Sequence, residues 1–411
     1  MMRTHYAGVL RLDDSGEVSV CGWVAHRRDH GGIVFIDLRD VTGIVQVVMD
    51  PQTPGCADAH QLRSEYVVRI TGVVRARPEG TVNPDMATGE IEVSATEVEI
   101  LNEAEPPPFP LDDRSEVDDA IRLRYRYLDL RRPRLARNLR LRAKMVAAIR
   151  AAMDAQGFTE VETPSLTRST PEGARDFLVP SRLQPGSFYA LPQSPQLFKQ
   201  LLMVAGLDRY YQVARCWRDE DLRADRQPEF SQLDVEASFV DVEDVMGFVE
   251  TAVEAGVEAI TGERPGKFPR LTWNEAMRRF GSDKPDTRFG MELVDCTDLF
   301  SGTGFKAFEA KHVVGLRAPG SGDVSRSQLD TWTDQVKHLG AAGLVWMRVR
   351  EGGVLESPIA KFLSPGELES LPVTLGAVSG DLLLRVADSK AQLAQRSLGA
   401  LRLELGAPAP A

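Results

Sequence analysis

A strand–loop–strand segment at residues 210–239 constrains the fold of this chain more than any other stretch. Residues 210–217 have the aromatic and β-branched content of a strand. Residues 233–239 alternate apolar and polar side chains, which predicts a returning strand with one apolar and one polar face. The loop between them is longer than a hairpin needs, and long loops in compact domains are often functional. It carries these charged residues: Arg218, Asp219, Glu220, Asp221, Arg223, Asp225, Arg226 and Glu229.

The arginines of this loop point to a chemistry. Planar guanidinium groups bind phosphate and carboxylate in bidentate geometry, so several of them on one strand–loop–strand predict a phosphate-binding platform. An ordinary charged hairpin tip would have the same composition, and the loop alone does not separate the two.

Composition excludes several classes of protein. An apolar fraction of 43% and a charged fraction of 27% are typical of soluble globular chains. No apolar run approaches the length of a membrane-spanning helix, and the N-terminus lacks the apolar core of a signal peptide. The four cysteines form no CxxC pair and the six histidines show no metal-ligand spacing. We therefore expect a cytoplasmic protein of about two to four domains, without a membrane segment or an identifiable metal site.

A net charge of -11 is unfavourable for binding a nucleic acid, but the local distribution of charge matters more than the sum. Between residues 120 and 144, ten positive charges face Asp129 alone. The ten are Arg122, Arg124, Arg126, Arg131, Arg132, Arg134, Arg137, Arg140, Arg142 and Lys144. Contact with a nucleic-acid backbone is one interpretation, and a solvated helix face with internal ion pairs is the other.

The first 104 residues predict an all-β domain. Candidate strands lie at 17–25, 32–38, 43–49, 66–77 and 90–101, separated by turn residues. Five short strands suit an OB-fold, and other small β barrels stay open on composition alone. The proline run at 105–110 is a stiff linker. Beyond it, Pro133 suits the first turn of a helix that Gly157 would end, and 158–164 reads as a strand ended by proline.

The charged loop carries a family resemblance. Residues 218–230, RDEDLRADRQPEF, resemble motif 2 of the class II aminoacyl-tRNA synthetases, in the form carried by the bacterial aspartyl-type enzymes. Residues 22–40 resemble their N-terminal anticodon-binding domain, and the helix–strand–proline unit resembles motif 1, which implies a homodimer. The implied fold class is α+β multidomain: an OB-fold barrel, an antiparallel-sheet catalytic domain and an α+β insertion domain.

The resemblance implies an aspartate-tRNA ligase reaction in two steps. Aspartate and ATP give aspartyl-adenylate and pyrophosphate, and the aspartyl group then passes to the 3′ end of tRNA(Asp). ATP is a substrate and Mg²⁺ an implied cofactor. Arg218 would be the catalytic residue, contacting both the α-phosphate and the attacking carboxylate. The remaining ATP contacts would be Asp219, Glu220, Gln227 and Phe230.

The aspartate pocket is implied residue by residue. Lys199 would pair with the side-chain carboxylate of the substrate, and Ser194, Gln196 and Asp234 would surround its α-amino group. Glu172 would contact the substrate from a mobile loop at 170–176. A cation for a carboxylate and an anion for an ammonium are the electrostatic complement of aspartate.

The barrel would read the anticodon. Phe35 would stack on a base, and Arg28, Gln46 and Glu92 would read base edges. Without the resemblance, Phe35 is equally well a core residue. His30 and Gly80 resemble the permissive type of the family, which implies that tRNA(Asn) is accepted as well.

The resemblance divides the chain into 1–104 (OB-fold), 105–132 (linker and hinge), 133–289 (catalytic, with motifs 1 and 2), 290–406 (bacterial insertion domain) and 407–411 (tail). A loop at 281–288 resembles a segment beside the active site. We find no match to motif 3, in whose part of the family the acidic magnesium ligand lies. The expectation is a truncated form that is poorly soluble, or inactive in aspartate-dependent ATP–pyrophosphate exchange.

Two alternatives were weighed. A non-catalytic tRNA-binding paralogue or fragment would use the barrel and the basic hinge, but it has no physical reason to keep both motif 2 and the Gln196/Lys199 pair. A related synthetase for asparagine or lysine is the other alternative. Lys199 in the pocket would repel a cationic substrate, and asparagine is disfavoured mainly by the resemblance.

Overall fold

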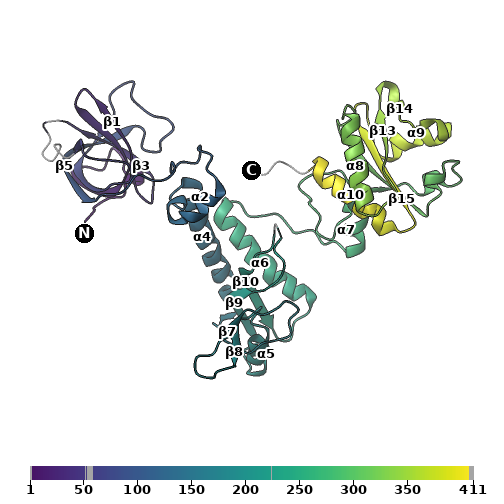
Figure 1. Ribbon diagram of the computed structural model, residues 1–411, viewed down its shortest axis with the longest axis horizontal. Helices are drawn as coiled ribbons and strands as arrows, with labels where there is room; N and C mark the ends of the chain where they lie inside the picture. The colour runs from purple at the N-terminus through teal and green to yellow at the C-terminus, as the bar shows by residue number, and fades with distance from the viewer. Residues whose placement is uncertain (1, 51, 53–58, 224, 407–411) are drawn as a thin grey trace. The chain divides into compact units, whose positions relative to one another are not determined.

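The computed structural model describes residues 2–50, 52, 59–223 and 225–406. Residue contacts divide the chain into two compact units, Met1–Gly266 and Lys267–Ala411, which are described separately (Figure 1). Within the described residues, no helix combines the length and the apolar character that crossing a membrane requires. Ala224 of the charged loop and the expected tail at 407–411 lie outside the described residues.

The N-terminal part of the first unit is a closed five-stranded barrel in the order β1-β2-β3-β5-β4, which confirms the expected OB-fold. Inward side chains of alternating residues, such as Val34, Ile36 and Leu38, fill its core. A register shift between Val24 and His26 extends β1 beyond the expected end. The elements are η1 (Ala7–Val9), β1 (Glu17–His30), β2 (Ile33–Arg39), β3 (Ile44–Met49), β4 (Val67–Ala76) and β5 (Ile91–Asn102).

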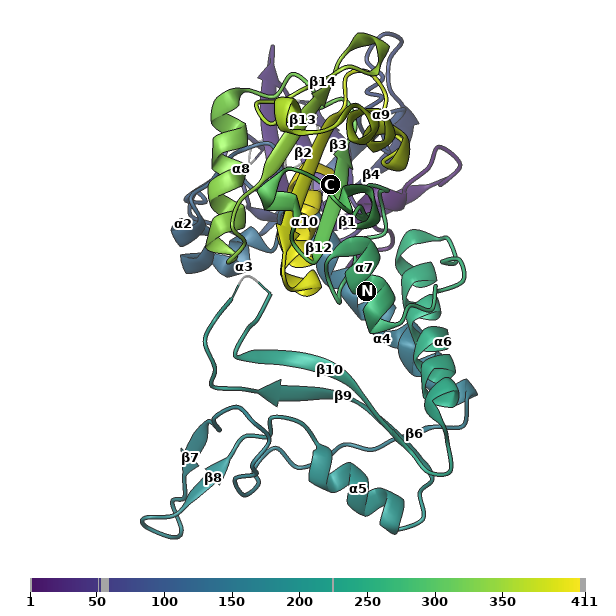
Figure 2. The ribbon, with the colours of Figure 1, turned by 90° about the vertical axis from the view of Figure 1, so that its right-hand side faces the viewer.

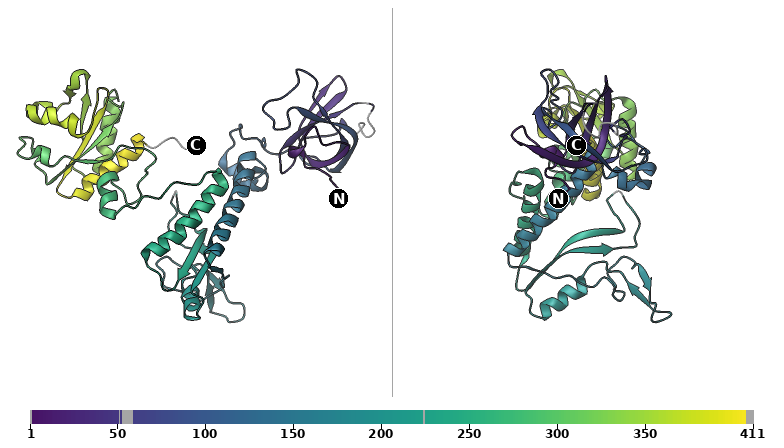
Figure 3. Two further views of the ribbon diagram at one scale, coloured as in Figure 1. Left: turned by 180° about the vertical axis from the view of Figure 1, so that it is seen from behind. Right: turned by 90° about the vertical axis from the view of Figure 1, so that its left-hand side faces the viewer.

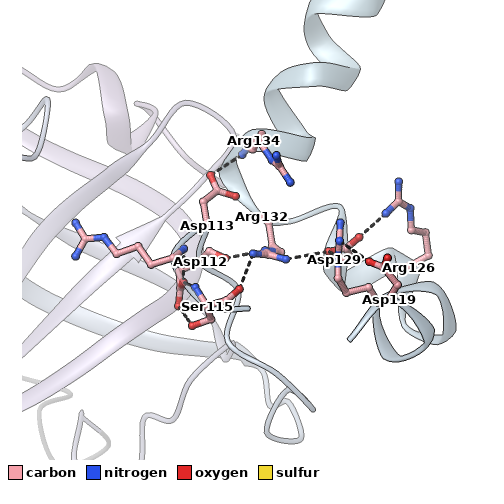
Figure 4. A network of polar contacts seen from close by, with 10 residues as sticks. Asp112, Asp113, Ser115, Asp119, Arg126, Asp129, Arg132 and Arg134 are labelled. Atoms are coloured by element: carbon pink, nitrogen blue, oxygen red, sulfur yellow. Dashed lines mark hydrogen bonds and ion pairs between the residues drawn. The ribbon is translucent and has the colours of Figure 1, made fainter. Parts of the chain in front are cut away.

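The hinge that follows contains two short helices, α2 (Asp119–Arg124) and α3 (Arg126–Asp129). They enclose the carboxylate of Asp129, which is 0% exposed. Arg122 donates to one of its oxygens over 3.1 Å, and Arg126 pairs with the other (Figure 4). Arg132 lies 3.7 Å away and also donates to the carbonyl oxygens of Asp112 and Ser115. The hinge is thus organised around one buried negative charge.

A second buried carboxylate joins the hinge to the barrel. Glu65 is 4% exposed and accepts hydrogen bonds from Arg39 of β2, at 2.7 and 2.8 Å, and from Arg131, at 2.6 Å. The Arg131 guanidinium also lies 4.9 Å from the centre of the Trp23 ring. The single Glu65 carboxylate therefore pairs with two arginines, Arg39 from the barrel and Arg131 from the hinge.

These contacts bear on the two interpretations of the basic stretch. Arg122, Arg126, Arg131 and Arg132 pair with buried carboxylates inside the unit, as the interpretation of internal ion pairs expects. Two more, Arg140 and Arg142, donate to neutral groups, the Val41 carbonyl oxygen and the Ser231 hydroxyl, and keep their positive charge uncompensated by any carboxylate that the structure describes. Contact of this stretch with a tRNA backbone stays a prediction.

The second part of this unit is a small sheet in the order β10-β9-β6, with β9 and β10 antiparallel and β6 parallel to β9. The long helices α4 and α6 pack side by side against one face, where Tyr211, Met153 and Ala252 are buried (Figure 3). Pro133 opens α4 as expected, and Gly157 follows its end with a positive φ of 78°. The bounds are α4 (Pro133–Ala155), β6 (Thr159–Glu160), β7 (Leu178–Pro180), β8 (Phe188–Ala190), α5 (Gln196–Val204), β9 (Arg209–Trp217), β10 (Glu229–Ala237) and α6 (Val242–Thr261).

One local expectation differs from the structure. Of the strand expected at 158–164, only Thr159–Glu160 pairs as β6. In α5, Pro195 occupies the N-cap position, and the Ser194 hydroxyl accepts from the Gln196 N–H at 3.3 Å.

The second unit is a layered α/β structure around an antiparallel sheet in the order β11-β12-β15-β13-β14. Leu382, Leu384 and Val386 of β15 face α8 and α10 on one side of the sheet. Leu383 faces α9 and two short 3₁₀ turns on the other side. The elements are α7 (Trp273–Phe280), β11 (Val294–Asp295), η2 (Asp298–Phe300), η3 (Lys306–Phe308), β12 (His312–Ala318), α8 (Arg326–His338), β13 (Val345–Val349), η4 (Glu351–Gly353), β14 (Leu355–Glu356), η5 (Ala360–Phe362), α9 (Pro365–Thr374), β15 (Leu382–Asp388) and α10 (Ala391–Gly406).

The segment 267–289, which the sequence places with the catalytic sheet, packs in this second unit instead. Helix α7 ends at Gly281, whose φ is 69°, and a side chain there would lie 2.1 Å from the Gln395 carbonyl oxygen of α10. Arg402 of α10 is 1% exposed and donates to the carbonyl oxygens of the loop that follows α7. Its acceptors are Asp286, Phe289, Gly290 and Met291. The 281–291 loop is therefore held by the C-terminal helix.

The hinge gives a stability prediction. Burial raises the pKa of Asp129, but the hydrogen bonds and charges of Arg122 and Arg126 outweigh it and the pKa is lowered. Asp129→Asn should cost about 3 kcal/mol at pH 7, because it places an amide donor among arginine donors. Urea unfolding at several pH values measures this. The deficit should begin to shrink below about pH 4, where the carboxylate becomes protonated in the unfolded chain, and should vanish only at the lower pH at which the folded-state carboxylate is protonated too.

Asp119→Asn is the matched control. The Asp119 side chain is 86% exposed and pairs with the same Arg122, so its loss should change stability by less than about 1 kcal/mol. Equal effects of the two substitutions would show that the hinge does not depend on the buried charge.

Candidate functional site

The β9–β10 ribbon lies beside α5, and one of its faces carries polar side chains (Figure 2). Because side chains alternate along a strand, Tyr210, Gln212, Ala214 and Cys216 share a face of β9. The register pairs Gln212 with Asp234 and Tyr210 with Glu236, so the acidic residues of β10 lie on that same face. Tyr211 and Leu233 point the other way and pack into the core beneath. The alternation in the sequence thus places polar side chains on one face of the ribbon and apolar side chains on the face that packs into the core.

Lys199 of α5 reaches this polar face. Its Nζ lies 2.9 Å from Asp234 Oδ1 and 3.4 Å from Glu236 Oε2, and its side chain is 12% exposed. Asp234 is 8% exposed, and its second oxygen, Oδ2, is buried without a hydrogen-bond partner. Burial raises the pKa of Asp234, against the lowering effect of Lys199. The pair is a cation and an anion sharing a nearly dry pocket, with one oxygen left to accept a donor.

The loop at 170–176 closes on the site through Glu172. Its carboxylate accepts hydrogen bonds from the Ser194 hydroxyl at 2.6 Å and the Thr170 hydroxyl at 3.1 Å. Gln193, 1% exposed, donates to the Ala174 carbonyl oxygen and accepts from the Ala174 N–H. The loop is therefore fastened to the segment that precedes α5 by a side-chain amide clamp.

Arg218 lies where β9 gives way to the charged loop. Its N–H donates to the Pro228 carbonyl oxygen at 2.8 Å, and its guanidinium lies 5.1 Å from the centre of the Phe230 ring. An open hollow of about 610 Å³ is lined by Arg218, Glu220, Asp225, Arg226, Gln227 and Phe230. An aromatic ring, a guanidinium and a glutamine around one hollow suit a base and a phosphate.

The remaining predicted nucleotide contact, Asp219, is held by backbone pairing with Arg175, which ties motif 2 to the 170–176 loop. Glu220 lies 3.6 Å from Arg226 across the hollow. Asp219 is therefore fixed through its backbone, whereas a nucleotide contact by the Glu220 carboxylate would share that group with Arg226.

Cys216 connects the two halves of the site. It is fully buried, and its thiol feels the charges of Asp234, Arg218, Glu172 and Lys199, so these side chains surround one point of β9. Burial raises the pKa of Cys216 to about 11. The sulfur is therefore a protonated thiol at neutral pH and does not act as a nucleophile.

A second polar cluster lies on the outer face of the barrel. Glu92, 2% exposed, accepts hydrogen bonds from Gln46 and from Arg75, each at 2.9 Å. Arg28 donates to the Asp37 carboxylate at 2.8 Å and to the side-chain amide oxygen of Gln46, Oε1, at 3.3 Å. Three predicted base-reading residues, Arg28, Gln46 and Glu92, thus form one network, and they would exchange partners when a base edge arrives.

Phe35 lies between Val34 and Ile36 of the barrel core and faces the other way, so it is half-buried rather than a core residue. The His30 ring meets it edge-on, 6.0 Å away between centroids. Gly80 sits in the turn after β4 with φ +80°, and a Cβ there would meet open space. Lysine at this position would therefore meet no clash but would carry the strain of a left-handed backbone.

The structure brings together Lys199, Asp234, Glu172, Ser194 and Arg218. Gln196 is the first residue of α5, about one turn before Lys199, and its backbone N–H donates to the Ser194 hydroxyl. Sequence reasoning missed three contributors: Glu236, Gln193 and Tyr210. Glu236 shares the alternation that singled out Asp234, so its signal was present, whereas the roles of Gln193 and Tyr210 depend on long-range hydrogen bonds.

Known proteins resemble this chain over most of its length. The family described as tRNA synthetases class II (D, K and N) matches residues 118–379, and the OB-fold nucleic acid binding domain matches residues 18–101. A relative named aspartate–tRNA(Asp/Asn) ligase from Moorella thermoacetica is 58% identical over 98% of this chain and 68% of its own length. The enzyme of that name from Mycobacterium tuberculosis is 54% identical, with coverage of 98% and 68%.

Solved structures of the same fold are more distant. Asparaginyl-tRNA synthetase from Pyrococcus horikoshii, complexed with asparaginyl-adenylate, superimposes with a TM-score of 0.55 at 19% identity, covering 95% of this chain and 93% of that one. The Entamoeba histolytica enzyme gives a TM-score of 0.55 at 18% identity, covering 94% of each chain. At that identity the likeness shows the fold. The family match over residues 118–379 and the relatives at 53–58% identity establish that this chain belongs to the class II tRNA synthetases of the D, K and N group.

Proposed function

We propose that this protein is an aspartate–tRNA ligase that forms aspartyl-adenylate from aspartate and ATP and transfers the aspartyl group to tRNA. The observation that carries the proposal is the Lys199–Asp234 pair on the ribbon face that leads to Arg218. A carboxylate recognised by Lys199 and an ammonium recognised by Asp234 describe a small acidic amino acid. Curated relatives of high identity bear the name aspartate–tRNA(Asp/Asn) ligase.

The activation step needs positioning and charge stabilisation rather than a protein nucleophile. The α-carboxylate of aspartate attacks the α-phosphorus of ATP, and the bond to the pyrophosphate oxygen breaks. Arg218 is placed to bind both the incoming carboxylate and the phosphate oxygens on which charge develops. Phe230 and Gln227, on the same hollow, would hold the adenine and ribose side of the nucleotide.

Class II synthetases use ATP with Mg²⁺. Across residues 2–50, 52, 59–223 and 225–406, no group of three or more His, Cys, Asp or Glu side chains could hold a metal ion. The role proposed for Arg218 rests on its own geometry.

The barrel network supplies the proposed tRNA contacts. Phe35 presents an aromatic face, and Arg28, Gln46 and Glu92 present donors and acceptors for unstacked bases. His30 and the open surroundings of Gly80 support a barrel that accepts the anticodons of both tRNA(Asp) and tRNA(Asn). We further propose a homodimer, as the motif 1 resemblance implies, which sedimentation analysis of the purified chain tests.

Lys199→Gln tests the substrate assignment. The variant keeps a polar side chain but loses the positive charge, so a non-hydrolysable aspartyl-adenylate analogue should bind about 100-fold more weakly, equivalent to about 2.7 kcal/mol. The asparaginyl analogue should lose much less. Isothermal titration calorimetry of the 411-residue chain with aspartyl, asparaginyl and lysyl analogues measures all three.

Lys144→Gln, on the exposed surface of α4, is the charge-matched control and should leave all three affinities unchanged. Wild-type preference for the asparaginyl or lysyl analogue would refute aspartate as the substrate. Binding of tRNA without binding of any analogue would instead favour a non-catalytic tRNA-binding protein.

Phe35→Leu tests the anticodon platform. Loss of base stacking should weaken binding of a tRNA(Asp) anticodon stem-loop about tenfold, since stacking contributes about 1–3 kcal/mol per base. Tyr6→Leu, an exposed aromatic on the same barrel, should have no effect. Fluorescence anisotropy at fixed salt measures both, and equal losses in the two variants would count against a specific role for Phe35.

Acceptance of both tRNAs has its own measurement. Anticodon stem-loops of tRNA(Asp) and tRNA(Asn) should bind the wild-type chain within about threefold of each other, less than the ~1–3 kcal/mol of a base contact that discriminates. Gly80→Lys should widen the gap in favour of tRNA(Asp). A strong wild-type preference for one stem-loop would contradict dual acceptance.

A further inference from the structure

Tyr210 is a fully buried tyrosine on the floor of the amino-acid site, and the proposed reaction gives it no role. Its hydroxyl donates to Gln212 Oε1 at 2.9 Å. The Thr163 hydroxyl donates to the same oxygen, also at 2.9 Å. Since Gln212 lies directly opposite Asp234 in the β9–β10 register, the Tyr210 hydroxyl lies beside the Asp234 carboxylate. A hydroxyl has one hydrogen, so it can serve Gln212 or Asp234 but not both.

The Asp234 carboxylate lacks a hydrogen-bond donor that the Tyr210 hydroxyl can supply. Oδ1 accepts from Lys199, and Oδ2 is buried without a donor. A buried acceptor left without a partner is costly. If Lys199 turns toward the carboxylate of an incoming aspartate, Asp234 loses its main donor as well. It must nevertheless stay ionised to receive the α-ammonium of the substrate.

We propose that Tyr210 is a positioning residue whose hydroxyl turns from Gln212 to Asp234 Oδ2 when aspartate engages Lys199. The Thr163 hydroxyl keeps Gln212 Oε1 satisfied after the turn, so the exchange leaves no oxygen without a donor. Asp234 is then held ionised, with its other oxygen aimed at the α-ammonium. The inference rests on the proposed function, because it assumes an amino acid that carries a second carboxylate.

The surrounding charges make this donor necessary. Lys199 comes from α5, Glu236 from β10, Cys216 from β9, Glu160 from β6 and Glu172 from the 170–176 loop. Arg218, at the end of β9, is the other cation of the site; the remaining neighbours are acidic or neutral, and Glu236 raises the pKa of Asp234. The Tyr210 hydroxyl already lies close enough to lower that pKa, and once Lys199 is engaged by substrate it is the neighbouring donor left to Asp234.

Tyr210→Phe removes the hydroxyl and keeps the ring. We expect the aspartyl-adenylate analogue to bind about tenfold more weakly at the lowest pH measured, and the deficit to shrink as the pH rises. Without the donor, the pKa of Asp234 rises, so the carboxylate becomes protonated at a higher pH and loses the ammonium. Calorimetric titration of the 411-residue chain between pH 5.5 and 7.5 measures the profile.

Tyr211→Phe is the matched control. The neighbouring ring is equally buried, and its hydroxyl donates to Asp154 at 2.8 Å on the opposite face of the ribbon. It should lower thermal stability about as much as Tyr210→Phe and leave the pH profile of binding unchanged. A stability change common to both variants therefore cannot imitate the expected result.

A second ligand isolates the ammonium. An analogue without the α-amino group should bind wild type and Tyr210→Phe equally well at every pH. A wild-type pH profile in Tyr210→Phe, or an equal loss with the deamino analogue, overturns the role of Tyr210 and leaves the substrate assignment intact. Failure of the wild-type chain to bind the aspartyl analogue at any pH overturns the proposed function, and this inference with it.

Discussion

The ion pair between Lys199 and Asp234 is the interaction on which the site depends. Both side chains are withdrawn from water, where an unpaired charge would be costly, so each fixes the other's place. The pair fastens α5 to the ribbon across 35 positions of sequence. In the function proposed above, the side-chain carboxylate of aspartate would take the place of Asp234 beside Lys199, and its ammonium the place of Lys199 beside Asp234. The proposed selectivity would then follow from the ion pair that exists before any ligand arrives.

Local periodicity was sufficient for the ribbon. Alternation along 233–239 predicted both strand and faces, and the register of β10 against β9 places Asp234 where that pattern implies. The five barrel strands were predictable for the same reason, because hydrophobic alternation and turn residues are local signals. Arg218 was singled out by the resemblance of its loop to motif 2, because the charged loop by itself does not separate a phosphate site from an ordinary hairpin tip. Glu236 could have been added from the same alternation.

Other features depend on partners that no local pattern reveals. The basic stretch around residue 130 looked like a nucleic-acid surface, since the sequence shows Asp129 but not Glu65, which folding brings to Arg131 from 66 positions away. The division of the chain after Gly266 was hidden likewise, because α7 has an amphipathic pattern that says nothing of which unit covers it. Tyr210 and Gln193 look like ordinary strand and loop residues until their hydrogen-bond partners are known.

Arg402 adds a consequence for the order in which the second unit is built. Its guanidinium closes the 281–291 loop through carbonyl oxygens that precede it by 111 to 116 residues. As the chain leaves the ribosome, that loop has no cation to gather its carbonyl groups until α10 emerges. The loop is therefore among the last parts of this unit to settle, and nascent chains stopped before residue 402 would present it to chaperones and proteases in an open form.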